Sequence, residues 1–164
     1  MKTLDLQPLT AAAFAPYGDV IETAGHEAQD MNRGMAVRWP DLARIDTDAD
    51  GKVTIGRVRS RRYPQPWDLT LVERHPLGSQ AFIPLETTPF VVVVAEAGDP
   101  PKPGALRGFV TDGIQGIHYR HGVWHAPLLT PFAAMDFIVV DRIGPGDNCE
   151  EYRLPEGETL RISV

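Results

Sequence analysis

Glycine and proline recur along the whole chain and divide it into short pieces. Fifteen Gly and fifteen Pro are spread over the 164 residues, and both residue types interrupt helices and the interiors of strands. The runs between them are rich in Val, Ile and Thr, which favour strands. Strands are predicted at 52–59, 68–75, 79–84, 90–95, 106–111, 116–119, 135–142 and 159–163. The pattern predicts an all-β fold, a jelly roll or small β-barrel with a few short helices.

The helical content is expected to be small. A helix is predicted at 10–15, where Thr10 is a suitable N-cap and Pro16 lies near the end. A further helical turn is expected at 40–43. The length suits one hydrophobic core, and no repeat or linker interrupts the chain, so residues 1–164 are predicted to form a single domain.

The charge balance argues against polyanionic partners. Sixteen Lys and Arg stand against 22 Asp and Glu, and the only dense basic run is 57–62, so neither nucleic acid nor an anionic membrane is expected as a partner. No apolar run approaches the roughly 20 residues that span a bilayer, and none resembles a signal peptide. Cys149 is the single cysteine, which excludes an intrachain disulfide and agrees with a reducing compartment. A cytoplasmic protein that binds a small molecule is the expectation.

The segment E-R-H-P-L-G-S-Q-A-F-I-P, residues 73–84, predicts a site inside the β structure. A period of two residues places Glu73 and His75 on the face of Leu69 and Leu71. After the Pro and Gly of the turn, Gln80 and Phe82 share a face in the same way. Polar groups that end two successive strands on their core-facing side are expected to meet in one pocket.

The spacing of these residues resembles the first cupin motif, His-x-His-x(3,4)-Glu. Glu73 takes the place of the first histidine and Gln80 that of the glutamate, while Gly122-Val123-Trp124-His125 keeps the Gly-x-x-His of the second motif without its proline. Glu73, His75, Gln80 and His125 are therefore the metal-ligand candidates, a nitrogen and oxygen set acceptable to Ni²⁺, Mn²⁺ or Fe²⁺. A neutral Gln weakens such a set, so catalysis without metal stays equally open.

Longer runs resemble the ureidoglycolate lyase family of allantoin and purine catabolism. They are R-H-P-L-G-S-Q-A-F-I-P, G-V-W-H-A-P-L and D-F-I-V-V-D-R, and the similarity extends from P-Y-G-D-V-I-E near the N-terminus to D-N-C-E near the end. The resemblance implies a cupin-type barrel, a homodimer, and elimination of urea from ureidoglycolate to leave glyoxylate. For that reaction, catalytic roles are predicted for His75, Glu73 and His125, with His75 favoured as base and either Glu73 or His125 as the proton source. The resemblance also implies a divalent metal such as Ni²⁺ as a possible cofactor.

Five further residues are predicted to bind substrate. If Val53 and Ile55 face the core, the same parity aims Arg59 inward, where its guanidinium would hold the substrate carboxylate; the alternative is a solvated row of arginines. The family resemblance favours the first reading of Arg59. The others are Gln80, which would orient the ureido carbonyl, Phe82 beside it, Trp124 as a pocket wall or core residue, and Asn32 as a ureido ligand or turn residue.

Other classes of function remain open at this point. A ureidoglycolate hydrolase, or another metal-dependent cupin enzyme acting on a small carboxylic acid, would use the same four positions. A non-catalytic module that binds a small acid would need the pocket and no proton transfer. Burial in an apolar barrel is further expected to raise the pKa of Glu73.

Overall fold

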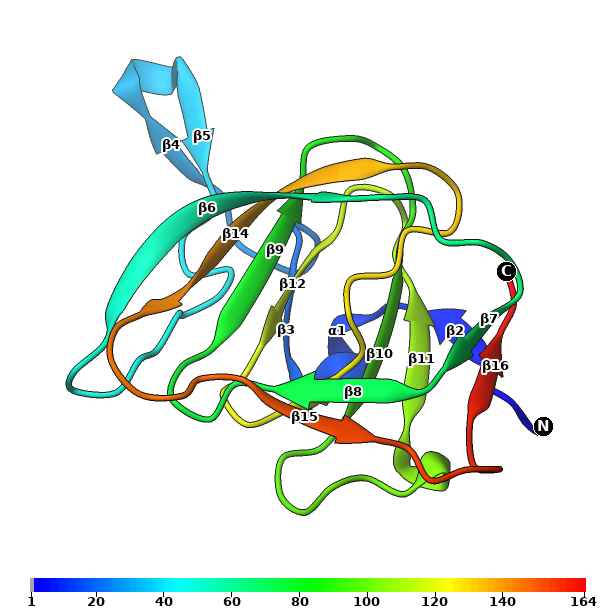
Figure 1. Ribbon diagram of the computed structural model, residues 1–164. Helices are drawn as coiled ribbons and strands as arrows, with labels where there is room; N and C mark the ends of the chain where they lie inside the picture. The colour runs from blue at the N-terminus through cyan, green and yellow to red at the C-terminus, as the bar shows by residue number, and fades with distance from the viewer. Residues whose placement is uncertain (1) are drawn as a thin grey trace.

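Strands make up most of the regular structure. A computed structural model describes residues 2–164 (Figure 1). The strands are β1 (Lys2–Thr3), β2 (Leu6–Pro8), β3 (Gly18–Ile21), β4 (Gln29–Met31), β5 (Ala36–Arg38), β6 (Lys52–Ser60), β7 (Trp67–Leu69), β8 (Leu71–Arg74), β9 (Gln80–Pro84), β10 (Val91–Ala95), β11 (Arg107–Val110), β12 (Gly116–Tyr119), β13 (Trp124–His125), β14 (Met135–Ile143), β15 (Glu150–Arg153) and β16 (Leu160–Ile162). The helical elements are α1 (Ala11–Phe14) and the 3₁₀ turns η1 (Asn32–Gly34) and η2 (Pro103–Ala105). The all-β prediction with a few short helices is confirmed.

Two large sheets enclose the main core. One has the order β3-β12-β9-β14-β6 and the other β15-β8-β13-β10-β11-β2, while β1-β16-β7 and β4-β5 form smaller sheets. Phe82, Ile117 and Phe137 from the five-stranded sheet pack with Val92 and Val94 of β10. This arrangement is a sandwich of jelly-roll type, and no strand pairing among residues 2–164 joins the two large sheets into a closed barrel.

Strand β10 is covered on both faces. Val92 and Val94 belong to the core between the large sheets. Val91, Val93 and Ala95 point the other way, into a second cluster with side chains from β7 and β16. All five residues are buried, which explains why this run lacks the alternation of a half-exposed strand.

The predicted strands are found with some changes in bounds. The run 68–75 is divided into β7 and β8 at Thr70. Leu69 and Val72, three residues apart, both enter the second cluster, so the alternation is broken at Thr70 and the expectation that Glu73 shares a face with Leu69 is wrong. Glu73 still faces the main core, because it lies opposite Val72 on β8.

The helix predicted at 10–15 is present as α1. The Thr10 hydroxyl accepts a hydrogen bond from the Ala13 amide at 3.2 Å, the expected N-cap contact. Residues 40–43 contain no helix, so that prediction is wrong. In the described part of the chain no helix is long and apolar enough to cross a membrane.

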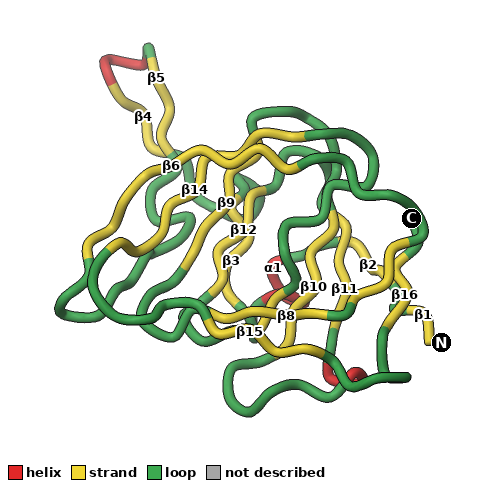
Figure 2. Tube along the Cα trace, viewed as in Figure 1, coloured by secondary structure: helices red, strands yellow, loops and turns green. Residues whose placement is uncertain are grey.

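The hairpin of β4 and β5 extends away from the rest of the molecule. Figures 1 and 2 show it projecting from the body near β6, with η1 at its tip. Asn32 and Arg33 in this tip have positive φ angles, which suits a tight reversal of direction.

Candidate active site

Strands β8 and β13 bring Glu73 and His125 side by side. The two residues are direct cross-strand partners in the antiparallel pair, so their side chains leave the same face. His75 follows the end of β8, and its ring centroid is 5.1 Å from that of His125. One potential ligand atom from each of Glu73, His75 and His125 lies within 4.8 Å of the others. The structure thus brings the three predicted catalytic residues together.

In both imidazoles, Nδ1 lies beside a backbone carbonyl oxygen. His75 Nδ1 lies 2.6 Å from the carbonyl oxygen of Asn148, and His125 Nδ1 lies 3.0 Å from that of Val123. A carbonyl oxygen accepts hydrogen bonds and cannot donate, so each Nδ1 carries the proton. The two Nε2 atoms are left as lone-pair acceptors, and both are buried without a hydrogen-bond partner.

The cluster needs a positive charge between its acceptors. His125 Nε2 lies 3.6 Å from a carboxylate oxygen of Glu73, and both atoms present lone pairs when the imidazole is neutral. A proton or a divalent cation placed between them would relieve this repulsion. The donor set of one carboxylate and two imidazoles, each imidazole oriented by a backbone acceptor, therefore fits a metal such as Ni²⁺ or Mn²⁺.

The charge states of Glu73 and His75 follow from their neighbours. A hydrogen bond from the His125 imidazole, when its Nε2 carries a proton, lowers the pKa of Glu73 and outweighs the opposing effect of burial, so the expectation of a raised pKa is wrong. Burial lowers the pKa of His75, with a further contribution from His125. Glu73 is an anion and His75 a neutral base at neutral pH.

Strands β9 and β12 supply the neighbouring groups. Gln80 is the cross-strand partner of Tyr119, and its Nε2 lies 3.2 Å from a carboxylate oxygen of Asp141. Its amide raises the pKa of His75, against the larger lowering by burial. Tyr119 stacks on His125 with ring centroids 4.3 Å apart and planes 11° apart. Gln80 thus lies beside the cluster of Glu73, His75 and His125. Tyr119 is not among the predicted site residues, although the period of two in the predicted strand 116–119 places it on the same face as Ile117.

The loop after β14 contributes contacts that local sequence patterns do not reveal. The Asn148 carbonyl accepts a hydrogen bond from His75 Nδ1, and the Asn148 side chain accepts one from the Leu77 amide at 2.8 Å. Cys149 Sγ lies 3.9 Å from Glu73. These residues are about 75 positions from Glu73 and His75, and no spacing rule connects them.

Three of the predicted substrate-binding residues lie in other surroundings. Phe82 is a core residue, in edge contact with Tyr119 and Phe137. Trp124 points away from His125, as consecutive strand residues do, and lies under Arg74 in the second cluster. Asn32 is exposed and lies in η1, between the two strands of the projecting hairpin.

Arg59 has a carboxylate partner of its own chain. Its Nε and Nη2 donate to Asp136 at 2.8 and 2.7 Å, and its side chain is 71% exposed. Val53 and Ile55 are exposed as well, so the expectation that they face the core is wrong. The inner face of β6 carries Gly56 and Val58 instead, paired with Val139 and Phe137 of β14.

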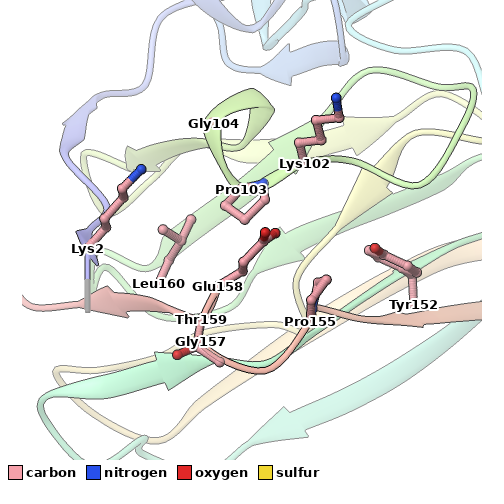
Figure 3. A pocket seen from close by; sticks show the side chains of 10 residues that line it. All are labelled: Lys2, Lys102, Pro103, Gly104, Tyr152, Pro155, Gly157, Glu158, Thr159 and Leu160. Carbon is pink, nitrogen blue, oxygen red and sulfur yellow. The ribbon is translucent and has the colours of Figure 1, made fainter.

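A large surface cavity lies elsewhere. It measures about 700 Å³ and is formed around η2 and the loop before β16 (Figure 3). Lys2, Lys102 and Glu158 are its charged lining residues, and none of the Glu73, His75 and His125 cluster contributes to it. The side chains of the buried cluster therefore do not line this cavity.

Sequence comparison with known proteins identifies the family to which the chain belongs. A sequence profile of the family described as "Ureidoglycolate lyase" matches residues 1–161. A protein named ureidoglycolate lyase from Pseudomonas aeruginosa (strain LESB58) is 48% identical over 163 residues, which cover 99% of this chain and 96% of the relative. One of the same name from Burkholderia mallei (strain NCTC 10229) is 51% identical over 157 residues, 95% of this chain and 92% of the relative. The chain therefore belongs to the ureidoglycolate lyase family.

Proposed function

We propose that this protein is a ureidoglycolate lyase, which cleaves the C–N bond of ureidoglycolate to give glyoxylate and urea in purine and allantoin degradation. The observation that carries the proposal is the 48–51% identity to proteins of that name over nearly the full length of both chains. The cluster of Glu73, His75 and His125 supplies groups for the chemistry. A cytoplasmic location and a homodimer accompany the proposal as predictions.

The reaction needs one base and one acid. A base removes the proton of the hydroxyl on the reacting carbon, the electron pair forms the aldehyde C=O as the C–N bond breaks, and an acid protonates the departing urea nitrogen. Atoms balance without water. Proton transfers of this kind contribute about 10²-fold to 10⁴-fold each.

The orientation of the imidazoles suggests the assignment of roles. His75 Nε2 is an unpartnered lone pair on an imidazole whose pKa is lowered, so it suits the base. Glu73 is ionised and is a poor acid, but its carboxylate lies 3.6 Å from His125 Nε2 and stabilises a proton there. His125 is the proposed acid, and the amide of Gln80 would orient the ureido carbonyl.

The same atoms would hold a divalent metal. Glu73, His75 Nε2 and His125 Nε2 are its proposed ligands, with the Gln80 amide oxygen as a fourth. When bound, the ion would supply Lewis acidity toward the substrate oxygens. An ion on both Nε2 atoms leaves neither free for proton transfer, so metal removal distinguishes the two uses of the cluster.

The proposal is tested by product analysis of purified protein with ureidoglycolate. Glyoxylate and urea are expected in equal amounts, because elimination leaves urea intact. Ammonia released at two equivalents per glyoxylate, with no urea and no urease present, would instead identify a hydrolase. Binding of ureidoglycolate without turnover would identify a non-catalytic module.

Metal analysis and chelation complete the test. Activity that survives removal of all divalent metal supports acid–base use of His75 and His125. Loss of activity on chelation, restored by Ni²⁺ or Mn²⁺, supports metal ligation. A matched assay with the His125→Ala variant shows whether the restored activity depends on this cluster.

A further inference from the structure

Strand β14 carries Asp141 near its end, on the side of the main core. Phe137 and Val139 of the same strand are core residues, and Asp141 continues their parity. The next residue, Arg142, points to the opposite face and binds Asp48 through Nε and Nη2, so its charge is already paired. Asp141 therefore faces the interior as a half-buried carboxylate, without help from its neighbour in sequence.

Asp141 contacts the candidate active site through Gln80. Strands β9 and β14 are neighbours in the five-stranded sheet (Figure 1). Their register pairs Val140 with Ala81, which puts Asp141 opposite Gln80. The Nε2 of Gln80 donates a hydrogen bond to Asp141 Oδ2 at 3.2 Å. The same amide raises the pKa of His75, so Gln80 lies between Asp141 and the cluster.

This contact decides which end of the Gln80 amide faces the cluster. A glutamine amide has an NH₂ donor at one end and an oxygen acceptor at the other. A carboxylate only accepts hydrogen bonds, so the NH₂ end is drawn to Asp141 and the oxygen is turned to the other side. An oxygen that accepts a hydrogen bond from an imidazolium raises the pKa of that ring, which is the effect that Gln80 has on His75.

The orientation of the amide adds a fourth acceptor to the cluster. His75 and His125 present unpartnered Nε2 atoms, and Glu73 presents a carboxylate. With the Gln80 oxygen, the set suits a divalent cation, or the N–H groups of a ureido substrate, better than it suits a carbonyl oxygen. Turned the other way, the NH₂ of Gln80 would repel a cation and would offer no acceptor to an N–H group.

We propose that Asp141 is a positioning residue, which holds the Gln80 amide with its oxygen toward the cluster. In the proposed lyase reaction, the Gln80 oxygen accepts a hydrogen bond from an N–H of the ureido group and so fixes the carbonyl beside it. The identity of this substrate rests on the proposed function, whereas the orientation of the amide does not.

Asp141→Asn removes the preference for one amide orientation and keeps the shape of the side chain. An asparagine offers both a donor and an acceptor, so Gln80 can turn its NH₂ toward the cluster. The affinity for Ni²⁺, measured by titration calorimetry, and kcat/KM for ureidoglycolate should each fall by about 10-fold to 100-fold, the usual loss when a partner that orients a ligand is removed. Asp136→Asn is the matched control and should leave both values unchanged. Asp136 lies on the same strand but bonds to Arg57 and Arg59.

Two double variants separate the orientation of the amide from the charge of Asp141. Gln80→Glu in the Asp141→Asn background has an oxygen at both ends, accepts from the asparagine NH₂ and should recover most of the loss. Gln80→Glu alone opposes two carboxylates and should bring no such gain. Gln80→Met has no amide to orient, so the addition of Asp141→Asn should lower its Ni²⁺ affinity no further. Circular dichroism checks the fold of each variant.

Four results would overturn the proposal. They are full Ni²⁺ affinity and turnover in Asp141→Asn, no recovery with Gln80→Glu, an equal loss in the control, and a further loss in the Gln80→Met background, which would show that the charge of Asp141 acts directly.

The two measurements also separate this proposal from the proposed function. If the wild type binds Ni²⁺ and does not convert ureidoglycolate, the proposed function fails and the Ni²⁺ affinities alone decide on Asp141. If it converts ureidoglycolate and binds no Ni²⁺, the kcat/KM values decide. A wild type that does neither would overturn the proposal as well, because the cluster would then have no ligand toward which the amide is held.

Discussion

At the scale of single residues, the direction of each side chain decides its role more than its type does. His75 and His125 have Nδ1 bonded to a carbonyl and Nε2 unpartnered, whereas His121 uses Nδ1 toward Asp46 and is exposed. Only the first two converge on Glu73. The sequence identified them because two histidines occurred at cupin spacing, a pattern that a single buried histidine does not provide.

His75→Ala and His125→Ala should each lower kcat by about 10²-fold or more, the contribution of a positioned acid or base. Steady-state assays with ureidoglycolate measure the loss, and circular dichroism checks the fold. His121→Ala is the control and should keep wild-type turnover. If either site variant keeps full turnover, that histidine is a structural residue and the assignment above is wrong for it.

The direction of Arg59 could not be predicted from local sequence. Both faces of β6 carry a plausible core pattern, Val53 and Ile55 on one and Gly56 and Val58 on the other. The neighbouring strand decides between them, because Val139 of β14 leaves little room opposite it: a Cβ on Gly56 would lie 3.1 Å from Val139. That pairing is a tertiary contact.

At the scale of elements, long apolar runs were predictable and short polar strands were not. The run 90–95 and the strand 135–142 were found because β-branched residues dominate them. Strand β13 holds only two residues and β15 is Glu-Glu-Tyr-Arg, so neither stands out from a loop. Both strands pair with β8. The pairing with β13 places His125 beside Glu73, and the pairing with β15 brings the end of the β14–β15 loop next to β8.

The loop from β14 to β15 is a clamp on the strand end that carries His75. Asn148→Ala would leave the Leu77 amide without its acceptor, at a cost of about 1 kcal/mol in stability, and should lower kcat about tenfold by loosening His75. Asn148→Asp keeps an acceptor oxygen and should restore most of both. Urea unfolding and steady-state kinetics measure the two quantities, and equal defects in both variants would argue against the clamp.

At the scale of the whole molecule, the candidate site should make stability depend on pH. The folded pKa of His75 lies below its ordinary value of 6.5 and that of Glu73 below 4.5, so in both cases the unfolded chain binds protons first as the pH falls. Stability is then full above about pH 6.5 and declines toward pH 4. Because residues 1–164 are predicted to form one domain, we expect a single unfolding transition whose free energy can be followed as the pH changes.

Urea unfolding at a series of pH values between 4 and 8 tests this dependence. His75→Gln removes one titrating group and should flatten the curve just below pH 6.5, because the pKa of His75 is lowered in the folded state. His121→Gln controls for loss of an exposed histidine. An unchanged curve in His75→Gln would show that His75 titrates alike in both states.

The acceptors that orient His75 and His125 belong to the main chain, and every residue type supplies a main-chain carbonyl. Substitution at positions 123 and 148 therefore cannot delete these two bonds directly, although it can displace them by moving the backbone. A point mutation at either position therefore leaves both imidazole tautomers unchanged unless it moves the backbone. Insertions or deletions that change the length of the segments around 123 and 148 are the changes this chemistry would tolerate least.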